Sequence, residues 1–189
     1  MDEGILMRSM TRISRLILLL ACITPTPVEL LGQEVAREYQ MKAAFLLNFA
    51  KLVTWPEDPT GHRSVCLLGA SPLSEALSSI EGRPASGRTI QTRRIESASE
   101  VDGCHVLFLA LPDKDVDAVL TTLSGRSILT VGDGESFAER GGAIGLTTWR
   151  NRIRIELNID IVEEAGLSVS SQLLHLARVV DNTVKSDGL

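Results

Sequence analysis

Apolar runs alternate with helix-like patterns through the middle of the chain. Continuous apolar runs at residues 64–70, 104–111 and 127–133 predict buried strands, because a strand covered on both faces has few polar positions. The intervening residues 71–80 and 113–123 show the apolar spacing of amphipathic helices. A repeated strand, helix, strand order is typical of a parallel sheet covered by helices.

The last third of the chain changes to a period of two. Apolar and charged residues alternate over residues 152–157, which predicts a strand with one buried face, paired in a hairpin with a strand over residues 143–147. Residues 168–180 have the pattern of a serine-capped amphipathic helix. We therefore predict an α/β fold: a mostly parallel sheet flanked by helices, with a C-terminal β-hairpin and a terminal helix.

The segment EYQMKAAFLLNFAKLVTWP, residues 38–56, predicts a helix that is apolar nearly all round, with Lys42 in the middle of its apolar face. In one interpretation Lys42 pairs with Glu38 one turn earlier and its stem covers apolar surface. In the other, this face also receives a partner, because a helix apolar nearly all round is either sandwiched or part of an interface. The candidate partner-binding residues are Lys42, Phe45, Phe49 and Trp55.

Residues 1–32 have the composition of an export signal, with basic residues followed by an apolar run over residues 16–23. That run is shorter than the roughly 18 to 20 residues of a membrane-spanning helix. We predict a signal peptide, a mature domain over residues 36–184 and a periplasmic location. Cys22 leaves a second possibility open, a lipoprotein leader that ends before it. The membrane would then be reached through a lipid on Cys22, and otherwise only through a partner.

Composition and motifs argue against several classes of function. The net charge of −5 argues against a nucleic-acid surface. The stretch LTVGDGESF places glycines between a strand and a helix, as dinucleotide sites do, but Phe137 stands where a third glycine is needed, so we expect a tight turn. Ser71 is a helix cap rather than a nucleophile, and the three histidines lack metal-ligand spacing. We expect no enzyme, no metal and no cofactor.

Cys66 and Cys104 are the two cysteines of the predicted mature domain. In an oxidising compartment two cysteines favour one disulfide, and two adjacent parallel strands would hold both sulfurs at nearly the same level. Two separate buried thiols are the alternative. A bridge would be either a structural link or a redox-sensitive one.

Several stretches together resemble the YfiR-like family of periplasmic proteins. They are EYQMKAAFLLNFAKLVTWP, GCHVLFL, ILTVGDGESFAERGGAIGL, NRIRIELNI and AGLSVSSQLLHLARVV, in the order of the family. The resemblance implies a compact α/β domain that forms a homodimer, with a disulfide between Cys66 and Cys104. Well-known members have a second cysteine pair in the segment corresponding to residues 141–152, which this sequence lacks, so redox control through a second bridge is not expected.

The resemblance also implies a function. The best-known members bind the periplasmic part of an inner-membrane diguanylate cyclase and keep it inactive. We therefore expect a periplasmic, non-enzymatic signalling regulator that represses such a cyclase or a similar sensor, and so lowers cyclic di-GMP and biofilm formation. The alternative is a periplasmic small-ligand binding domain of another signalling or receptor system, with its pocket at the strand ends near Ser71 and Asp133.

Overall fold

The computed structural model of the chain describes residues 27–56, 61–150 and 152–181. Two units make up the chain, residues 1–37 and residues 38–189. The predicted signal peptide over residues 1–32 lies mostly outside the described residues, and Cys22 lies wholly outside them. Within the described residues, no helix has both the length and the apolar character needed to cross a bilayer.

The long helix α2 (Pro27–Leu52) begins in the first unit and continues into the second. In the second unit its apolar positions pack into the core, with Leu46, Ala50 and Phe49 at most 1% exposed. Proline suits the first turn of a helix because its missing N–H would have no partner there. The helix ends at Leu52, where Val53 enters a short strand.

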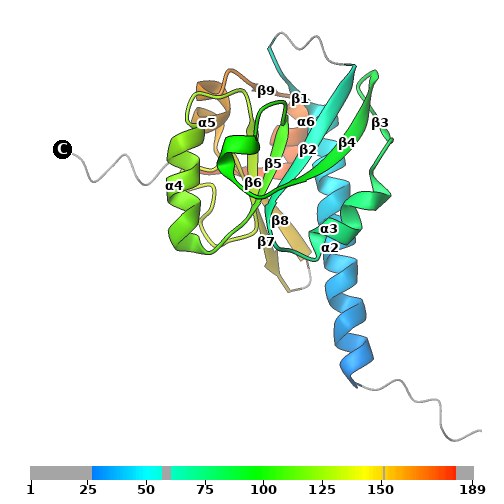
Figure 1. Cartoon of the computed structure of the whole chain (residues 1–189). Coiled ribbons are helices and arrows are strands. Elements are labelled where there is room, and N and C mark those ends of the chain that lie inside the picture. The colour runs from blue at the N-terminus through cyan, green and yellow to red at the C-terminus, as the bar shows by residue number, and fades with distance from the viewer. Residues whose placement is uncertain (1–26, 57–60, 151, 182–189) are drawn as a thin grey trace, which may run out of the picture. The chain divides into compact units, whose positions relative to one another are not determined.

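An eight-stranded sheet forms the centre of the second unit (Figure 1). Its strand order is β10-β8-β7-β6-β5-β2-β4-β3. Pairing is parallel except for β7 with β8 and β3 with β4, which are antiparallel. The strands are β2 (His62–Gly69), β3 (Pro84–Ala85), β4 (Arg88–Ile95), β5 (Val106–Ala110), β6 (Leu129–Gly132), β7 (Ile144–Trp149), β8 (Arg152–Leu157) and β10 (Ala177–Val179). A separate two-stranded sheet pairs β1 (Val53–Thr54) with β9 (Ser168–Val169).

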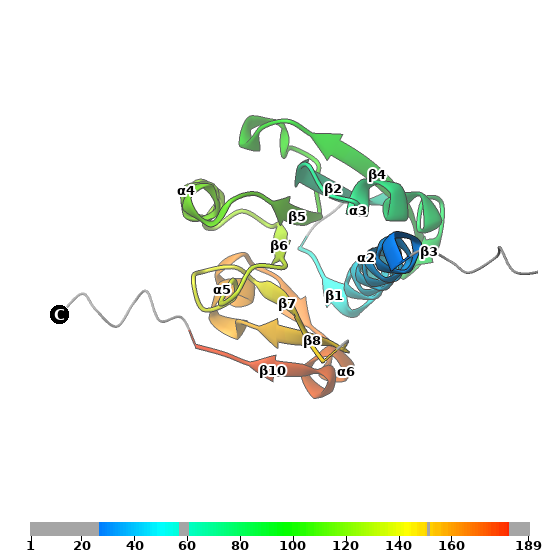
Figure 2. The same ribbon diagram turned by 90° about the horizontal axis from the view of Figure 1, so that it is seen from below.

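Helices cover both faces of the large sheet, as Figure 2 shows for α2 and α3 (Leu73–Ala76) on one side and α4 (Asp113–Leu123) on the other. The strands contribute alternate residues to two cores. Val65, Leu67 and Phe108 pack with α2 and α3. Leu68 and Leu107 pack with α4. The period of two along each strand therefore explains both cores, and the predicted fold class is confirmed.

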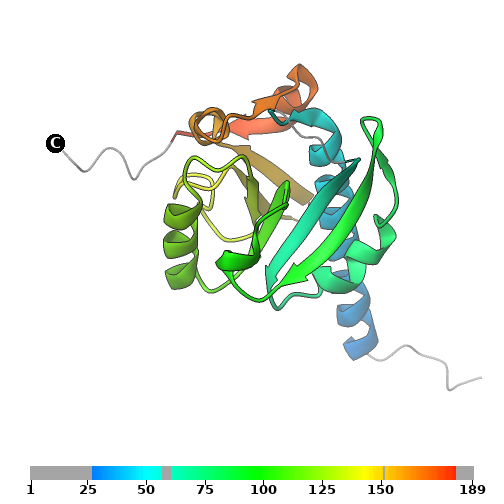
Figure 3. The same ribbon diagram turned by 45° about the horizontal axis from the view of Figure 1, so that its top comes forward.

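Shorter helical segments connect the strands in the second unit (Figure 3). Ser71 accepts a hydrogen bond at Oγ from the backbone N–H of Leu73 at 3.1 Å, but the N-cap position of α3 is Pro72, one residue later than predicted. The 3₁₀ turn η1 (Leu77–Ser79) continues α3. The remaining short helical segments are η2 (Ala98–Glu100), α5 (Ile159–Glu164) and α6 (Ser171–Leu176).

The terminal helix is shorter than predicted. It spans only Ser171–Leu176, and the chain then forms β10, which pairs in parallel with β8. The N–H of Val180 donates to the carbonyl of Leu157 at 2.9 Å. The open edge of β8 offers backbone partners to residues 177–179, and that tertiary pairing overrides the helical spacing. The predicted hairpin of β7 and β8 is present, with β10 outside it.

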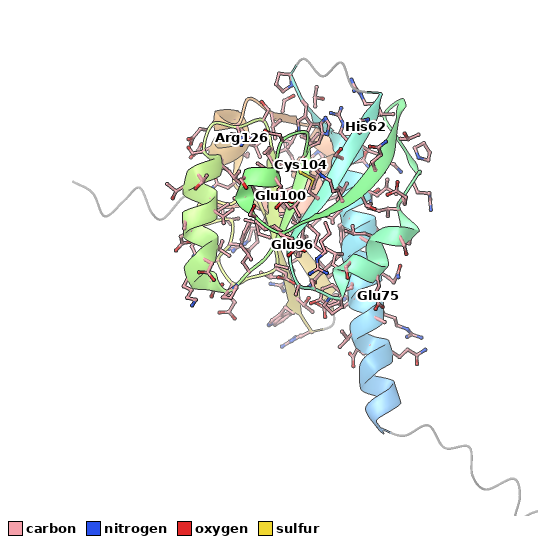
Figure 4. The ribbon with its side chains drawn as sticks, in the orientation of Figure 1. His62, Glu75, Glu96, Glu100, Cys104 and Arg126 are labelled. Carbon is pink, nitrogen blue, oxygen red and sulfur yellow. A yellow bond between two sulfur atoms is a disulfide. The ribbon has the colours of Figure 1, made fainter. Side chains whose placement is uncertain are left out.

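Cys66 and Cys104 form a disulfide with a Cα–Cα distance of 5.9 Å. Cys66 lies in β2, and Cys104 lies just before the neighbouring strand β5, where Figure 4 labels it. The adjacency of the two strands, with Val65 opposite Val106, brings the sulfurs together as the sequence predicted. Both sulfurs are in the core on the α4 side, and the guanidinium of Arg93 lies 3.2 Å from the Cys104 sulfur.

Candidate functional site

A cleft of about 1250 Å³ lies in the second unit between α2, the turn after β6 and the hairpin of β7 and β8. Its lining includes Lys42, Asp133, Trp149 and Arg178. β6 and β7 run parallel, so their carboxyl ends point the same way, and Asp133 follows β6 directly. In open α/β sheets this carboxyl edge is the usual place for a site.

Lys42 is buried at the wall of the cleft and is paired with two carboxylates. Its Nζ lies 2.8 Å from Glu38 and 2.9 Å from Asp133, and its side chain is 4% exposed. The ammonium also lies 4.6 Å from the centre of the Tyr39 ring. Burial lowers the pKa of Lys42, but the hydrogen bonds to Glu38 and Asp133 and their charges outweigh it, so the pKa is raised overall. Lys42 is therefore a charged anchor between α2 and the β6 turn.

Glu38 extends this connection to the hairpin. Thr148, in β7, donates a hydrogen bond from its hydroxyl to Glu38 at 2.9 Å. The hydrogen bond from Lys42 lowers the pKa of Glu38; burial opposes this, but the Thr148 hydrogen bond and the Lys42 charge add to it. The group of Glu38, Lys42, Asp133 and Thr148 thus ties α2 to the turn after β6 and to β7.

A second ion pair lies across the outer strands of the cleft. Arg178 of β10 donates to Glu156 of β8 at 2.7 Å and lies 3.7 Å from Glu139. The Glu156 hydrogen bond and charge raise the pKa of Arg178. These contacts help to hold β10 at the edge of the sheet.

The end of the hairpin carries an aromatic ring among arginines. Trp149 is 48% exposed, and the guanidiniums of Arg150 and Arg154 lie 4.0 Å and 4.3 Å from the centre of its ring. Arg152 is exposed and lies opposite Trp149 on the neighbouring strand of the hairpin. Trp149, Arg150, Arg152 and Arg154, which we call the hairpin-tip cluster, line a hollow of about 540 Å³ together with Ile153.

The four candidate partner-binding residues occupy different environments. Lys42 and the half-buried Phe45 line the cleft. Phe49 is 1% exposed, and its ring lies 6.1 Å from that of Phe45. Trp55 is 7% exposed and donates from Nε1 to the carbonyl of His105 at 3.2 Å. Contact of these four residues with a partner stays a prediction. Because Phe49 and Trp55 are buried, they would support the surface around them rather than contact a partner directly.

The glycine-rich stretch after β6 forms the tight turn expected there, and the residues that follow continue as turns rather than as a helix. Phe137 packs so closely on Gly132 and Gly142 that a Cβ at either glycine would lie within 2.4 Å of its ring. The glycines therefore make room for Phe137, and the turn presents Asp133 to Lys42. Ser71 is not part of this cleft, although it follows β2 as expected.

The cleft is suited to binding rather than to proton transfer by Lys42. A raised pKa keeps the ammonium charged, whereas a lysine that acts as a base needs a lowered one. Across the described part of the chain, no three histidine, cysteine, aspartate or glutamate side chains are grouped in a way that would hold a metal ion.

The sequence pointed to Lys42, to its pairing with Glu38 and to a pocket near Asp133, but not to the contact of Asp133 with Lys42 or to the hairpin-tip cluster. Asp133 lies 91 residues from Lys42, so no local spacing connects them. The signal for Asp133 was an acid directly after a buried strand. The signal for the cluster was the group of arginines around Trp149 at a hairpin turn.

Two solved structures resemble the chain at low identity. One is the ABC domain in complex with L-Trp from Streptococcus pneumonia, with 12% identity, a TM-score of 0.49 and coverage of 75% of this chain and 60% of that one. The other is a conserved domain protein from Vibrio cholerae O1 biovar eltor, with 10% identity, a TM-score of 0.47 and coverage of 75% and 59%. The chain thus spans about 60% of the length of the first of these structures.

The family comparison covers most of the second unit. The YfiR/HmsC-like family model matches residues 39–178, from Tyr39 in α2 to Arg178 in β10. That range contains the disulfide, nearly all of the large sheet and nearly all of the cleft lining. The chain belongs to the YfiR/HmsC-like family.

Proposed function

We propose that the protein is a periplasmic, non-enzymatic regulator that binds and represses an inner-membrane diguanylate cyclase or a similar sensor. The family match over residues 39–178 carries this proposal, because membership indicates a regulator of diguanylate cyclase signalling in the periplasm. Repression would lower cyclic di-GMP and biofilm formation. The cleft and the exposed hairpin supply surfaces for protein binding, and Lys42 in its charged state supports that role better than a catalytic one.

Repression by binding has a simple thermodynamic requirement. A binder shifts a sensor toward its inactive state only if it binds that state more tightly than the active one. Moving the equilibrium from 1:99 to 99:1 takes about 5.5 kcal/mol of differential affinity. A homodimer, which we also propose, would present two copies of the binding surface and so raise the effective affinity for a dimeric sensor.

Export belongs to the same proposal. Residues 1–32 would act as a signal peptide, and residues 36–184 would be the mature domain that meets the sensor. If the leader instead ends before Cys22, a lipid there would keep the domain at the membrane beside its partner.

Deletion of the gene tests the proposed function. In a strain with the candidate cyclase intact, deletion should raise cellular cyclic di-GMP, and a plasmid copy should restore the original level. The nucleotide is measured by mass spectrometry of cell extracts. An unchanged level after deletion would contradict repression of a cyclase.

The cleft supports a second candidate, a periplasmic small-ligand binding domain. Its volume of about 1250 Å³ is larger than the roughly 300–1,000 Å³ typical of small-molecule pockets, so a small ligand would have room in part of it, and Lys42, Asp133 and Arg178 line it with both signs of charge. A thermal-shift screen of zwitterionic metabolites tests this candidate. A ligand at 100 times its Kd should stabilise the isolated domain by about 2.7 kcal/mol. If none stabilises the domain while the cyclase domain does, the first proposal stands alone.

A further inference from the structure

The hairpin of β7 and β8 extends beyond the strands on both of its sides. β6 ends at Gly132, opposite Gly145, so Leu146–Trp149 have no partner in β6. On the outer side β10 pairs only with Ile155–Leu157, which leaves Arg152–Arg154 without a partner in β10. The end of the hairpin is therefore a two-stranded ribbon, which projects below β5 and β6 in the view of Figure 1.

The register of the ribbon places Trp149, Arg152 and Arg154 on the face opposite Thr148, and Trp149 and Arg154 also line the cleft. Trp149 pairs with Arg152, and Thr147 pairs with Arg154, so these four side chains share one face. Thr148 lies on the other face and bonds to Glu38 of α2. The ribbon is thus anchored to α2 by one face and exposes arginine and tryptophan on the other.

In the part of the chain that the structure describes, the positive charges of the cluster have no ion-pair partner. Among the described residues, no carboxylate lies within ion-pair distance of Arg150, Arg152 or Arg154, although the whole chain has a net charge of −5. Like charges on neighbouring positions of a ribbon repel one another. A negatively charged group from outside would relieve this repulsion, and the planar guanidinium would bind a carboxylate with two hydrogen bonds.

We propose that the hairpin-tip cluster is the docking surface for an acidic segment of the partner protein. This proposal rests on the proposed function and assigns it a surface. Tryptophan and arginine are the side chains that most often dominate protein interfaces. Trp149 provides an apolar surface, and the guanidiniums of Arg150 and Arg154 over its ring add positive charge that attracts carboxylates.

Charge distribution favours a protein partner over a bilayer. A membrane-bound tryptophan inserts its ring among the headgroups, whereas the Trp149 ring is already stacked with two guanidiniums. The net charge of −5 would also repel the rest of the chain from an anionic lipid surface. An acidic protein segment, by contrast, would need to contact only the hairpin-tip cluster and not the rest of the negatively charged chain.

Two charge-reversal variants with equal change in net charge test the proposal. The first is R152E/R154E in the cluster, and the control is R83E/K114E, at two exposed positions away from the hairpin. R152Q/R154Q is a milder form of the first variant if glutamates at the tip impair folding. Circular dichroism checks that each full-length chain is folded before comparison.

Complementation of the deletion strain separates this proposal from the proposed function. Wild-type protein and R83E/K114E should restore the low cyclic di-GMP level, whereas R152E/R154E should leave it raised. If deletion itself changes nothing, the proposed function fails. If deletion raises the nucleotide and R152E/R154E still restores it, the docking surface is wrong while the proposed function stands.

Direct binding completes the test, with the purified periplasmic domain of the affected cyclase as one probe and phosphatidylglycerol vesicles as the other. R152E/R154E should bind the cyclase domain roughly tenfold or more weakly than wild type, and R83E/K114E should bind it nearly normally. Wild-type binding should weaken with salt. Equal binding by all variants, or vesicle binding that R152E/R154E abolishes while cyclase binding persists, would overturn the proposal.

Discussion

Lys42 connects α2 to the rest of the cleft through two carboxylates on different elements. It is 3% exposed as a residue, so its ammonium depends on Glu38 and Asp133 for the interactions that water would otherwise supply. Its partners are about one-third exposed, at 33% and 29%, and remain partly hydrated. Removing the ammonium therefore costs more than removing an exposed lysine and less than breaking a fully buried pair.

Lys42→Met should lower the free energy of unfolding by about 1–3 kcal/mol, because two carboxylates lose their cation while the apolar stem is kept. Urea denaturation followed by circular dichroism measures the change. Lys51→Met is the matched control, since Lys51 is exposed on the same helix and forms no ion pair with the described residues. The control should stay within about 0.5 kcal/mol of wild type. Equal stability of the two variants would contradict the anchoring role.

Stability should fall in acid partly through Glu38. Its pKa is lowered from the ordinary value of 4.5, so the unfolded chain binds this proton more readily than the folded one. The contribution of Glu38 to the free energy of unfolding is fully present above pH 4.5 and is lost as the pH falls below that value. Urea midpoints measured from pH 7 to pH 3 should decline less steeply for Glu38→Gln than for wild type. Parallel declines would show that Glu38 is not the responsible group.

The contribution of Lys42 to stability depends on pH in the opposite direction. Its pKa is raised from 10.5, so its contribution is present below that value and is lost as the pH rises through the folded-state pKa.

At the scale of elements, β2 and β5 are joined both by backbone pairing and by a covalent link. The disulfide of Cys66 and Cys104 closes a loop with a sequence separation of 38 residues. Closing a loop of this length restricts the unfolded chain by about 3–4 kcal/mol on the entropic model. The link lies in the core on the α4 side, so it also fixes the register of two strands that carry residues of both cores.

Reduction of the disulfide should lower the free energy of unfolding by about 2–4 kcal/mol. Urea denaturation with and without a reductant measures the loss. The double variant C66A/C104A should be destabilised and should no longer respond to reductant. If wild type were equally stable in both conditions, the bridge would contribute nothing to stability.

At the scale of the second unit, the two cores share the strands of one sheet. Val65, Leu67 and Phe108 serve one core, and Leu68 and Leu107 of the same strands serve the other. Losing the pairing of β2 and β5 would expose both cores together. The described part of this unit should therefore unfold as one cooperative body.

Equal urea midpoints from two spectroscopic probes would show this cooperativity. Trp149→Phe removes the exposed tryptophan of the two in the sequence, so fluorescence then reports Trp55 in the core beside α2. Its urea midpoint should equal the midpoint from far-UV circular dichroism, which reports all elements. Separate midpoints would mean that the two cores unfold independently.

Local pattern predicted much of the second unit. The apolar run around Cys66 and the alternation over residues 152–157 correctly indicated β2 and β8, because side-chain periodicity follows directly from backbone geometry. The pattern gave a wrong prediction at residues 177–179. Helical spacing continues there, but these residues form β10 because β8 offers an unpaired edge. Hydrogen bonding to a distant strand leaves no trace in local spacing.

The sequence by itself determined the strands, the amphipathic helices, the cysteine pair and the resemblance that the family match confirms, since each depends on residue type and short-range spacing. Only the tertiary structure decided that Lys42 meets Asp133 and that the end of the hairpin projects with Trp149 among three arginines. These features depend on strand order and on where neighbouring strands end. Both are set by packing between residues far apart in the chain, which no local pattern records.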